Sequence, residues 1–177
     1  NYVGGIYGDN NTYSDYSHIT ATIQVPNWRG LLMSYSEVEF YLAEAAERGW
    51  SVGGTAASHY DLGITASIVD DWGGTALAAT TYLANPSVNF ATATGTNKEK
   101  IGTQSWIASY DRGMLGWTTW RRLDAPTFNL PALTGNAVPK RYTYPATEQT
   151  LNGANYSSAA SAIGGDAQAT KIFWDVN

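Results

Sequence analysis

The chain has 177 residues, a formal net charge of −5 and no cysteine. Disulfides, thiolate metal sites and cysteine nucleophiles are therefore excluded, and the ten Lys and Arg residues form no run that could follow a nucleic-acid backbone. No apolar run approaches the roughly 18 residues that a membrane-spanning helix requires. The length suits one domain or part of a larger one, and the start at Asn1 rather than Met leads us to expect a fragment or a processed chain.

The chain is rich in aromatic residues and poor in charge. Charged residues make up 14% of the chain, which also contains seven Trp, twelve Tyr and four Phe. This mixture is typical of a protein outside the cytoplasm, where exposed aromatic rings can stack on sugars. Most of the Trp residues are nevertheless expected in the core, because each one buries a large apolar area.

Residues 1–30 carry clusters of Gly, Asn, Asp and Ser, which favour turns. We expect an irregular lead, with one short strand where apolar residues alternate from Ile19 to Val25. The segment from Asp9 to Asp15 offers oxygen ligands of the kind that Ca²⁺ uses. It lacks the glycine and the distal glutamate of an EF-hand loop, so a solvated turn is the favoured interpretation.

Two helices are predicted next, as an antiparallel pair. Ser34 and Glu37 have the spacing of a capping box, which predicts a helix over residues 35–48, and Gly49 is placed to end it. A stripe of apolar residues predicts a second helix over about residues 56–71. Small residues along both helices resemble the close-packing positions of a tetratricopeptide repeat, although no second copy is visible.

Three more helices are expected after this pair. A short one over residues 76–83 ends before an Asn-Pro pair, because the residue before proline disfavours the helical conformation. Thr96 and Glu99 form another capping box, which opens a fourth helix. Gly113 separates that helix from a fifth, which ends near Leu123.

The remainder of the chain, residues 124–177, contains four prolines and few periodic apolar positions, so an irregular tail is predicted. Within it, residues 139–156 are expected to form an ordered, non-helical wrap over the helices around Trp106 and Trp120. The aromatic residues of the tail are expected to fix this wrap in place.

Two pairs of charged residues are interpreted as structural. Arg121 and Arg122 close an aromatic-flanked helix, where cations interact favourably with the negative helix end. Arg141 and Glu148 are available in the tail, and an arginine fork binds carboxylates in a fixed geometry. We therefore expect a guanidinium–carboxylate clamp that fastens the tail to the helices.

Candidate catalytic and metal-binding residues are few. His18 and His59 lack neighbouring ligands at metal-site spacing, so neither is predicted to bind a metal. Asp70 and Asp71 are adjacent on a helix and point in different directions, whereas glycoside hydrolysis requires two carboxyl groups that face one bond. No nucleophile-elbow, P-loop or dinucleotide motif is present, so we expect neither an enzyme nor a cofactor.

Several stretches together resemble the C-terminal region of SusD/RagB-like proteins, in the order and spacing of that family over about residues 31–175. They are LLMSYSEVEFYLAEAAERGW, HYDLGITASIVDDWG, KIGTQSWIASYDRGMLGWTTWRRLDAP and VPKRYTYPATEQTLNGANY, with KIFWD near the end. The resemblance implies a mainly α-helical fold with tetratricopeptide-like helix pairs. It also implies a surface-exposed, lipid-anchored outer-membrane protein of Bacteroidetes-like bacteria, which binds glycans or other nutrients and caps a SusC-like TonB-dependent transporter.

Individual positions match the motifs of that family. Glu37 and Glu44 fall on its acidic helix positions, and Gln104 and Trp106 fall on its Q-x-W pair. Trp120 precedes the Arg pair. The tail pattern is matched by Arg141, Tyr144, Pro145, Glu148, Asn152, Asn155 and Tyr156. By this resemblance, the matched positions define the fold and are not expected to contact ligand.

The chain also departs from the family pattern. Residues 123–126 read Leu-Asp-Ala-Pro, where Thr-Gly often precedes the proline, and Ser105 stands where Lys is frequent. Both are interpreted as subfamily variation. The N-terminal part of the family, with its lipid-bearing cysteine and much of the sugar site of the starch-binding members, is not matched by this chain.

The leading hypothesis is a glycan-capture module. Tyr13, Tyr16 and Trp28 are the candidate ligand contacts, because they are bulky aromatics in a polar lead that no helix stripe requires. One alternative is a fragment of a glycoside hydrolase, which would need two converging carboxyl groups. The other is a protein-interaction scaffold of tetratricopeptide type, which would need repeats beyond one helix pair.

Overall fold

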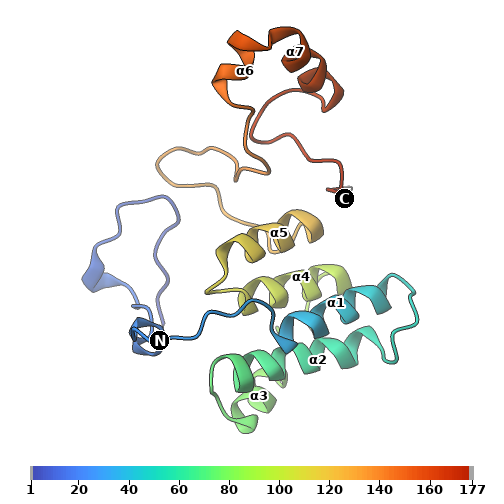
Figure 1. The fold of residues 1–177 in the computed structure, drawn as a ribbon. Helices are drawn as coiled ribbons and strands as arrows, with labels where there is room; N and C mark the ends of the chain where they lie inside the picture. The colour runs from blue at the N-terminus through green and yellow to red at the C-terminus, as the bar shows by residue number, and fades with distance from the viewer. Residues whose placement is uncertain (1, 176–177) are drawn as a thin grey trace. The chain divides into compact units, whose positions relative to one another are not determined.

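The computed structural model describes residues 2–175, and the regular secondary structure of these residues is entirely helical (Figure 1). The predicted mainly α-helical fold class is therefore confirmed. The chain divides into two compact units. Gly30–Thr127 form the helical unit, whereas residues 2–29 and 128–175 form the lead–tail unit.

Helices α1 (Tyr35–Glu47) and α2 (Ala56–Ala66) form the predicted pair and lie side by side (Figure 1). The Ser34 hydroxyl accepts a hydrogen bond from the backbone N–H of Glu37 at 3.3 Å, so the expected residue caps α1. In α2, Gly63 lies against the Phe40 ring, and a Cβ atom at Gly63 would be 3.1 Å from ring carbons. The crossing of the two helices therefore requires a very small residue here.

Helix α2 continues directly into a π-helical segment, η3 (Ser67–Asp71). Its wider turn is closed by the Trp72 N–H, which donates to the Ser67 carbonyl at 3.1 Å. The second predicted helix therefore has the expected extent, with a widened last turn. Ser36 Oγ donates to Asp71 Oδ2 at 2.5 Å, which ties the end of η3 to the start of α1.

The next three helices begin and end close to the predicted residues. They are α3 (Ala76–Leu83), α4 (Asn97–Ala108) and α5 (Gly113–Leu123). The capping box of α4 has both of its reciprocal bonds: the Thr96 hydroxyl accepts from the Glu99 N–H at 3.2 Å, and Glu99 Oε2 accepts from the Thr96 N–H at 2.6 Å. Local side-chain chemistry thus fixes where α4 begins.

The hydrophobic core of the helical unit lies where these helices meet. Tyr60 is fully buried within it, and its hydroxyl donates to the Val88 carbonyl at 2.6 Å, so its one polar group is satisfied. The core consists of Phe40, Ala43, Tyr60, Ile64, Val88, Ile101, Ala108 and Leu123. These residues come from helices α1, α2, α4 and α5 and from the loop after α3, so the core joins elements that are far apart in sequence.

The lead–tail unit contains four short helical segments. They are η1 (Tyr13–Asp15), η2 (Ala21–Gln24), α6 (Ala146–Leu151) and α7 (Gly153–Ala162). The strand expected from Ile19 to Val25 is wrong, because η2 occupies this segment. The Thr20 hydroxyl accepts from the Thr22 N–H at 3.3 Å and caps the turn locally, whereas a strand needs a partner strand for its hydrogen bonds.

The expectation of an irregular, non-helical tail is also wrong, because α6 and α7 lie within it. Helix α7 is rich in alanine, the residue with the highest helix propensity. Neither helix contains a buried residue, so the apolar periodicity that predicts helices is missing. The predicted wrap over the helices around Trp106 and Trp120 stays a prediction.

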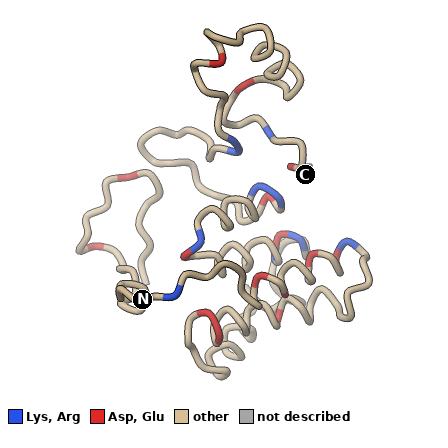
Figure 2. The backbone as a smooth tube through the Cα atoms, in the orientation of Figure 1, with Lys and Arg blue, Asp and Glu red and all other residues tan. Residues whose placement is uncertain are grey.

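Charged residues are sparse in both units. Figure 2 shows scattered Lys, Arg, Asp and Glu, with no run of basic residues along the described chain. The predicted helical core, residues 31–123, lies within the helical unit, and the expectation of a single domain over the whole chain stays a prediction. Within residues 2–175, none of the helices combines the length and the apolar character needed to cross a membrane.

Candidate functional site

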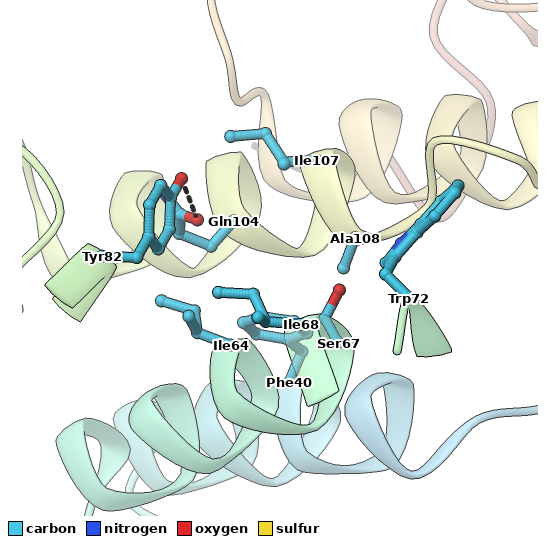
Figure 3. Close-up of a pocket in the computed structure, with 9 residues that line it drawn as sticks. All are labelled: Phe40, Ile64, Ser67, Ile68, Trp72, Tyr82, Gln104, Ile107 and Ala108. Atoms are coloured by element: carbon cyan, nitrogen blue, oxygen red, sulfur yellow. Dashed lines mark hydrogen bonds between the residues drawn. The ribbon is translucent and has the colours of Figure 1, made fainter. Parts of the chain in front are cut away.

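The helical unit contains a hollow of about 240 Å³ between its helices. Figure 3 shows side chains from α1, α2, η3, α3 and α4 around it. The lining residues are Phe40, Ile64, Ser67, Ile68, Trp72, Tyr82, Gln104, Ile107 and Ala108. Its wall is mostly hydrocarbon and is continuous with the core, so the hollow suits a compact apolar group more than a charged one.

Gln104, the first residue of the predicted Q-x-W pair, has a structural contact in this hollow. Its Oε1 atom accepts a hydrogen bond from the Tyr82 hydroxyl at 3.1 Å (Figure 3), which links α4 to the end of α3. Trp106, the other member of the pair, does not line the hollow and is partly exposed. The Trp106 ring packs against α5 at Gly116, where a Cβ atom would be 3.5 Å from the ring.

The acidic position Glu37 forms an ion pair that links distant parts of the helical unit. Glu37 Oε2 lies 2.7 Å from Arg112 Nη1, and Glu37 Oε1 accepts from the Tyr41 hydroxyl at 2.8 Å. Burial and the bond to Glu37 raise the pKa of Tyr41 to about 12. Arg112 was not predicted from the sequence, because its partner is 75 residues away and no local pattern relates the two.

Glu44 and the Arg pair join α1 to α5. The Glu44 carboxylate pairs with Arg122 and also with Arg48, the latter at 2.9 Å. Arg122 lies 5.1 Å from the centre of the Tyr41 ring, and burial lowers the pKa of Arg122 from its usual value. These contacts fit the structural role expected for the Arg pair.

The other member of the Arg pair and the tryptophan before it are also packed within the helical unit. Arg121 stacks on the Trp117 ring at 3.6 Å from its centre. Trp120 is almost completely buried. These contacts hold Arg121 and Trp120 within the packing of α5.

The three predicted ligand contacts lie in the lead of the lead–tail unit and differ in exposure. Tyr13 is 76% exposed and stacks on His18, with 3.6 Å between ring centres and 18° between ring planes. Tyr16 and Trp28 are half-buried. Tyr13 thus offers one open aromatic ring, on a segment that is kept in place by a short local contact.

The oxygen-rich segment of the lead forms a self-bonded turn. Asn11 Oδ1 accepts from the Ile6 N–H at 2.7 Å, and Asp9 Oδ1 accepts from the Asn10 N–H at 2.7 Å. No group of three His, Asp or Glu residues in the described part of the chain has the arrangement of a metal site.

The tail has an ion pair of its own. Arg141 Nη1 lies 2.7 Å from Asp166 Oδ1, whereas Glu148 accepts from the Asn152 side chain at 3.0 Å and pairs with no arginine among the described residues. Glu148 is thus bonded to its own helical neighbour four residues on, and the clamp expected between the tail and the helices stays a prediction. Although burial opposes it, the Tyr144 N–H and the Arg141 guanidinium hold the pKa of Asp166 below its usual range.

The chain belongs to the SusD-like family: the family model described as "Starch-binding associating with outer membrane" matches residues 1–145. Among solved structures, a SusD-like protein of Bacteroidetes AC2a is 28% identical with a TM-score of 0.77, over 89% of this chain and 33% of that one. A chitin-binding SusD homolog of Flavobacterium johnsoniae is 31% identical with a TM-score of 0.64, over 82% of this chain and 36% of that one.

A further solved structure and the curated proteins were also compared with this chain. A protein titled as chitin-binding is 36% identical with a TM-score of 0.64, over 81% of this chain and 33% of that one. The chain therefore spans about a third of the length of these solved relatives. The comparison with curated proteins gave no match.

Proposed function

We propose that the chain is the C-terminal part of a surface glycan-binding protein of the outer membrane. In this proposal the full protein captures oligosaccharides and passes them to a TonB-dependent transporter, and a lipid anchor outside this chain attaches it to the membrane. The observation that carries the proposal is the match to the SusD-like family over residues 1–145. The chitin-binding titles of two relatives support a glycan as the ligand.

Within this chain, we propose that the aromatic residues of the lead contribute to the ligand surface. Tyr13 supports this best, because its ring is largely exposed and is already stacked on His18. An aromatic ring of this kind offers apolar area at a low cost in conformational entropy. Tyr16 and Trp28 are proposed as neighbouring contacts on the same lead.

Tryptophan fluorescence provides the test. Chitohexaose, cellohexaose and maltohexaose are titrated into the chain, and at least one is expected to change the emission in a saturable way. Replacing Trp28 with Phe should reduce this change. The control is Trp50→Phe, because Trp50 is 68% exposed at the turn after α1 and should leave the response unchanged. No response to any of the three hexasaccharides would refute the proposed function.

We propose binding without hydrolysis. The adjacent pair Asp70 and Asp71 is a poor acid–base pair, since the Asp71 carboxylate is buried and bonded to Ser36. The release of reducing ends from the same three hexasaccharides should stay at the level of the buffer. Sustained turnover would favour the hydrolase alternative instead.

A further inference from the structure

The tail contains a second concave site, which lies apart in sequence from the aromatics of the lead. Helices α6 and α7 meet at Asn152, which ends one helix and precedes the other, and a depression of about 380 Å³ opens in the bend between them. Its lining residues are Tyr144, Pro145, Glu148, Asn152, Asn155, Tyr156 and Ala159. The volume is at the small end of the roughly 300–1,000 Å³ typical of ligand sites, which suits one or two sugar units.

One carboxylate, that of Asp166, bonds to both tyrosines of this depression. Asp166 Oδ2 accepts from the Tyr156 hydroxyl at 3.2 Å, and Asp166 Oδ1 accepts from the Tyr144 N–H at 3.1 Å. The two rings meet edge to face, with 6.0 Å between their centres and 82° between their planes. Because the Tyr156 hydroxyl is already bonded, its ring contributes mainly carbon surface to the depression.

A row of three polar side chains runs along the same depression. Asn152 Nδ2 donates to Glu148 Oε2 at 3.0 Å, and Asn155 Nδ2 donates to Asn152 Oδ1 at 2.6 Å. These bonds orient the two amides but do not use all of their hydrogen-bonding capacity. Asn155 keeps its carbonyl oxygen and one N–H without a partner among the described residues, and Glu148 keeps one carboxylate oxygen in the same state.

This combination matches the chemistry of one kind of sugar. A pyranose ring has an apolar face that packs on aromatic carbon, and its hydroxyl groups can donate to a carboxylate oxygen. An acetamido substituent offers one N–H donor and one C=O acceptor, which complement the free carbonyl and N–H of Asn155. The methyl group of the acetamido substituent can lie against the hydrocarbon of Pro145 and Ala159.

We propose that the depression between α6 and α7 binds an N-acetylated, neutral sugar unit of the captured glycan, with Asn155 recognising the acetamido group and Tyr156 packing on the ring. The Glu148 carboxylate disfavours an anionic sugar at the same place, because like charges repel. This inference rests on the proposed function and assigns a contact to tail positions that the family resemblance interprets as purely structural.

The test compares chitohexaose with cellohexaose, which has the same linkage but no acetamido groups, by isothermal titration of the full chain. Chitohexaose should bind more tightly. Asn155→Ala should weaken chitohexaose binding about two- to tenfold, as expected for one or two lost hydrogen bonds, and should reduce the preference over cellohexaose. The matched control is Ser158→Ala, because Ser158 is an exposed residue of α7 that does not line the depression.

The possible outcomes separate this inference from the proposed function. If the parent binds chitohexaose and Asn155→Ala binds it equally well, the inference is overturned and the proposed function stands. If Asn155→Ala weakens both hexasaccharides equally, acetamido recognition is overturned. If the parent binds none of the hexasaccharides, both proposals are refuted. Circular dichroism melts of both variants check that a change in affinity does not come from unfolding. The inference is supported if Asn155→Ala melts like the parent and loses affinity mainly for chitohexaose.

Discussion

The helical unit and the tail form helices for different physical reasons. In the helical unit, α1 and α2 bury a continuous apolar face, and Ser or Thr side chains cap the starts of α1 to α4. In the tail, α6 and α7 have no side-chain cap and no buried residue, and the polar contacts of Asp166 fix their surroundings. Apolar burial is therefore the main source of stability in the first region, whereas the second relies more on polar contacts such as those of Asp166.

The largest expected effect is the removal of the Phe40 ring, which is 2% exposed in the core of the helical unit and packs on Gly63. Phe40→Ala should lower the free energy of unfolding by about 3–5 kcal/mol, since it removes apolar contacts and leaves a cavity. Urea unfolding followed by circular dichroism measures this loss. The control is Leu32→Ala, a fully exposed residue whose replacement should change stability by no more than about 0.5 kcal/mol.

A smaller effect is expected at the start of α4. Thr96→Ala removes the hydroxyl that accepts from the Glu99 N–H and should reduce the free energy of unfolding by about 1 kcal/mol. Thr94→Ala is the matched control, because Thr94 is exposed and precedes the helix. Equal urea midpoints for the two variants would contradict the view that local caps stabilise this unit.

The smallest effect concerns pH and is confined to the tail. Because the pKa of Asp166 is lowered in the folded state, its contribution is fully present above the ordinary aspartate pKa of about 3.9 and is lost as the pH falls through the lower folded value. The NMR shift of the Tyr144 amide proton, which donates to Asp166, should titrate with a midpoint below that ordinary value. The Ala78 amide, which donates to the neutral Thr75 hydroxyl, is the internal reference.

Asp166→Asn provides the control for this titration. The amide side chain cannot ionise in this range, so the midpoint at Tyr144 should disappear. A midpoint that survives in Asp166→Asn would mean that another carboxyl group controls the Tyr144 amide.

Local signals explain why the sequence predicts the helical unit well. Caps such as Ser34 and Thr96, together with apolar stripes, identify five helices, and each of these signals acts within a few residues. The same reasoning fails at α6 and α7, whose faces are polar. In α7 the residues at helical spacing are mostly polar, so no apolar stripe marks the helix. They are Asn152, Asn155, Tyr156 and Ala159.

Partners that are distant in sequence could not be predicted in this way. Arg141 was expected to have a carboxylate partner, but Asp166 lies 25 residues away in a segment with no regular pattern. Similarly, Glu37 was identified only as a capping-box residue and an acidic helix position, and its ion pair with Arg112 depends on how the start of α5 is placed against α1. Long-range pairing is set by the packing of whole helices, which a linear pattern does not encode.

The π-helical turn η3 sets the angular position of Asp71 and Trp72 around the helix axis. An α-helix advances by about 100° per residue, since it has 3.6 residues per turn, and a π turn accommodates one additional residue without lengthening the helix by a full step. If the same residues formed an ordinary α-helical turn instead, the side chains that follow would be rotated by about that angle. Asp71 would then turn away from Ser36, and Trp72 would leave the wall of the hollow in Figure 3. The wider turn of η3 thus orients both residues for these contacts.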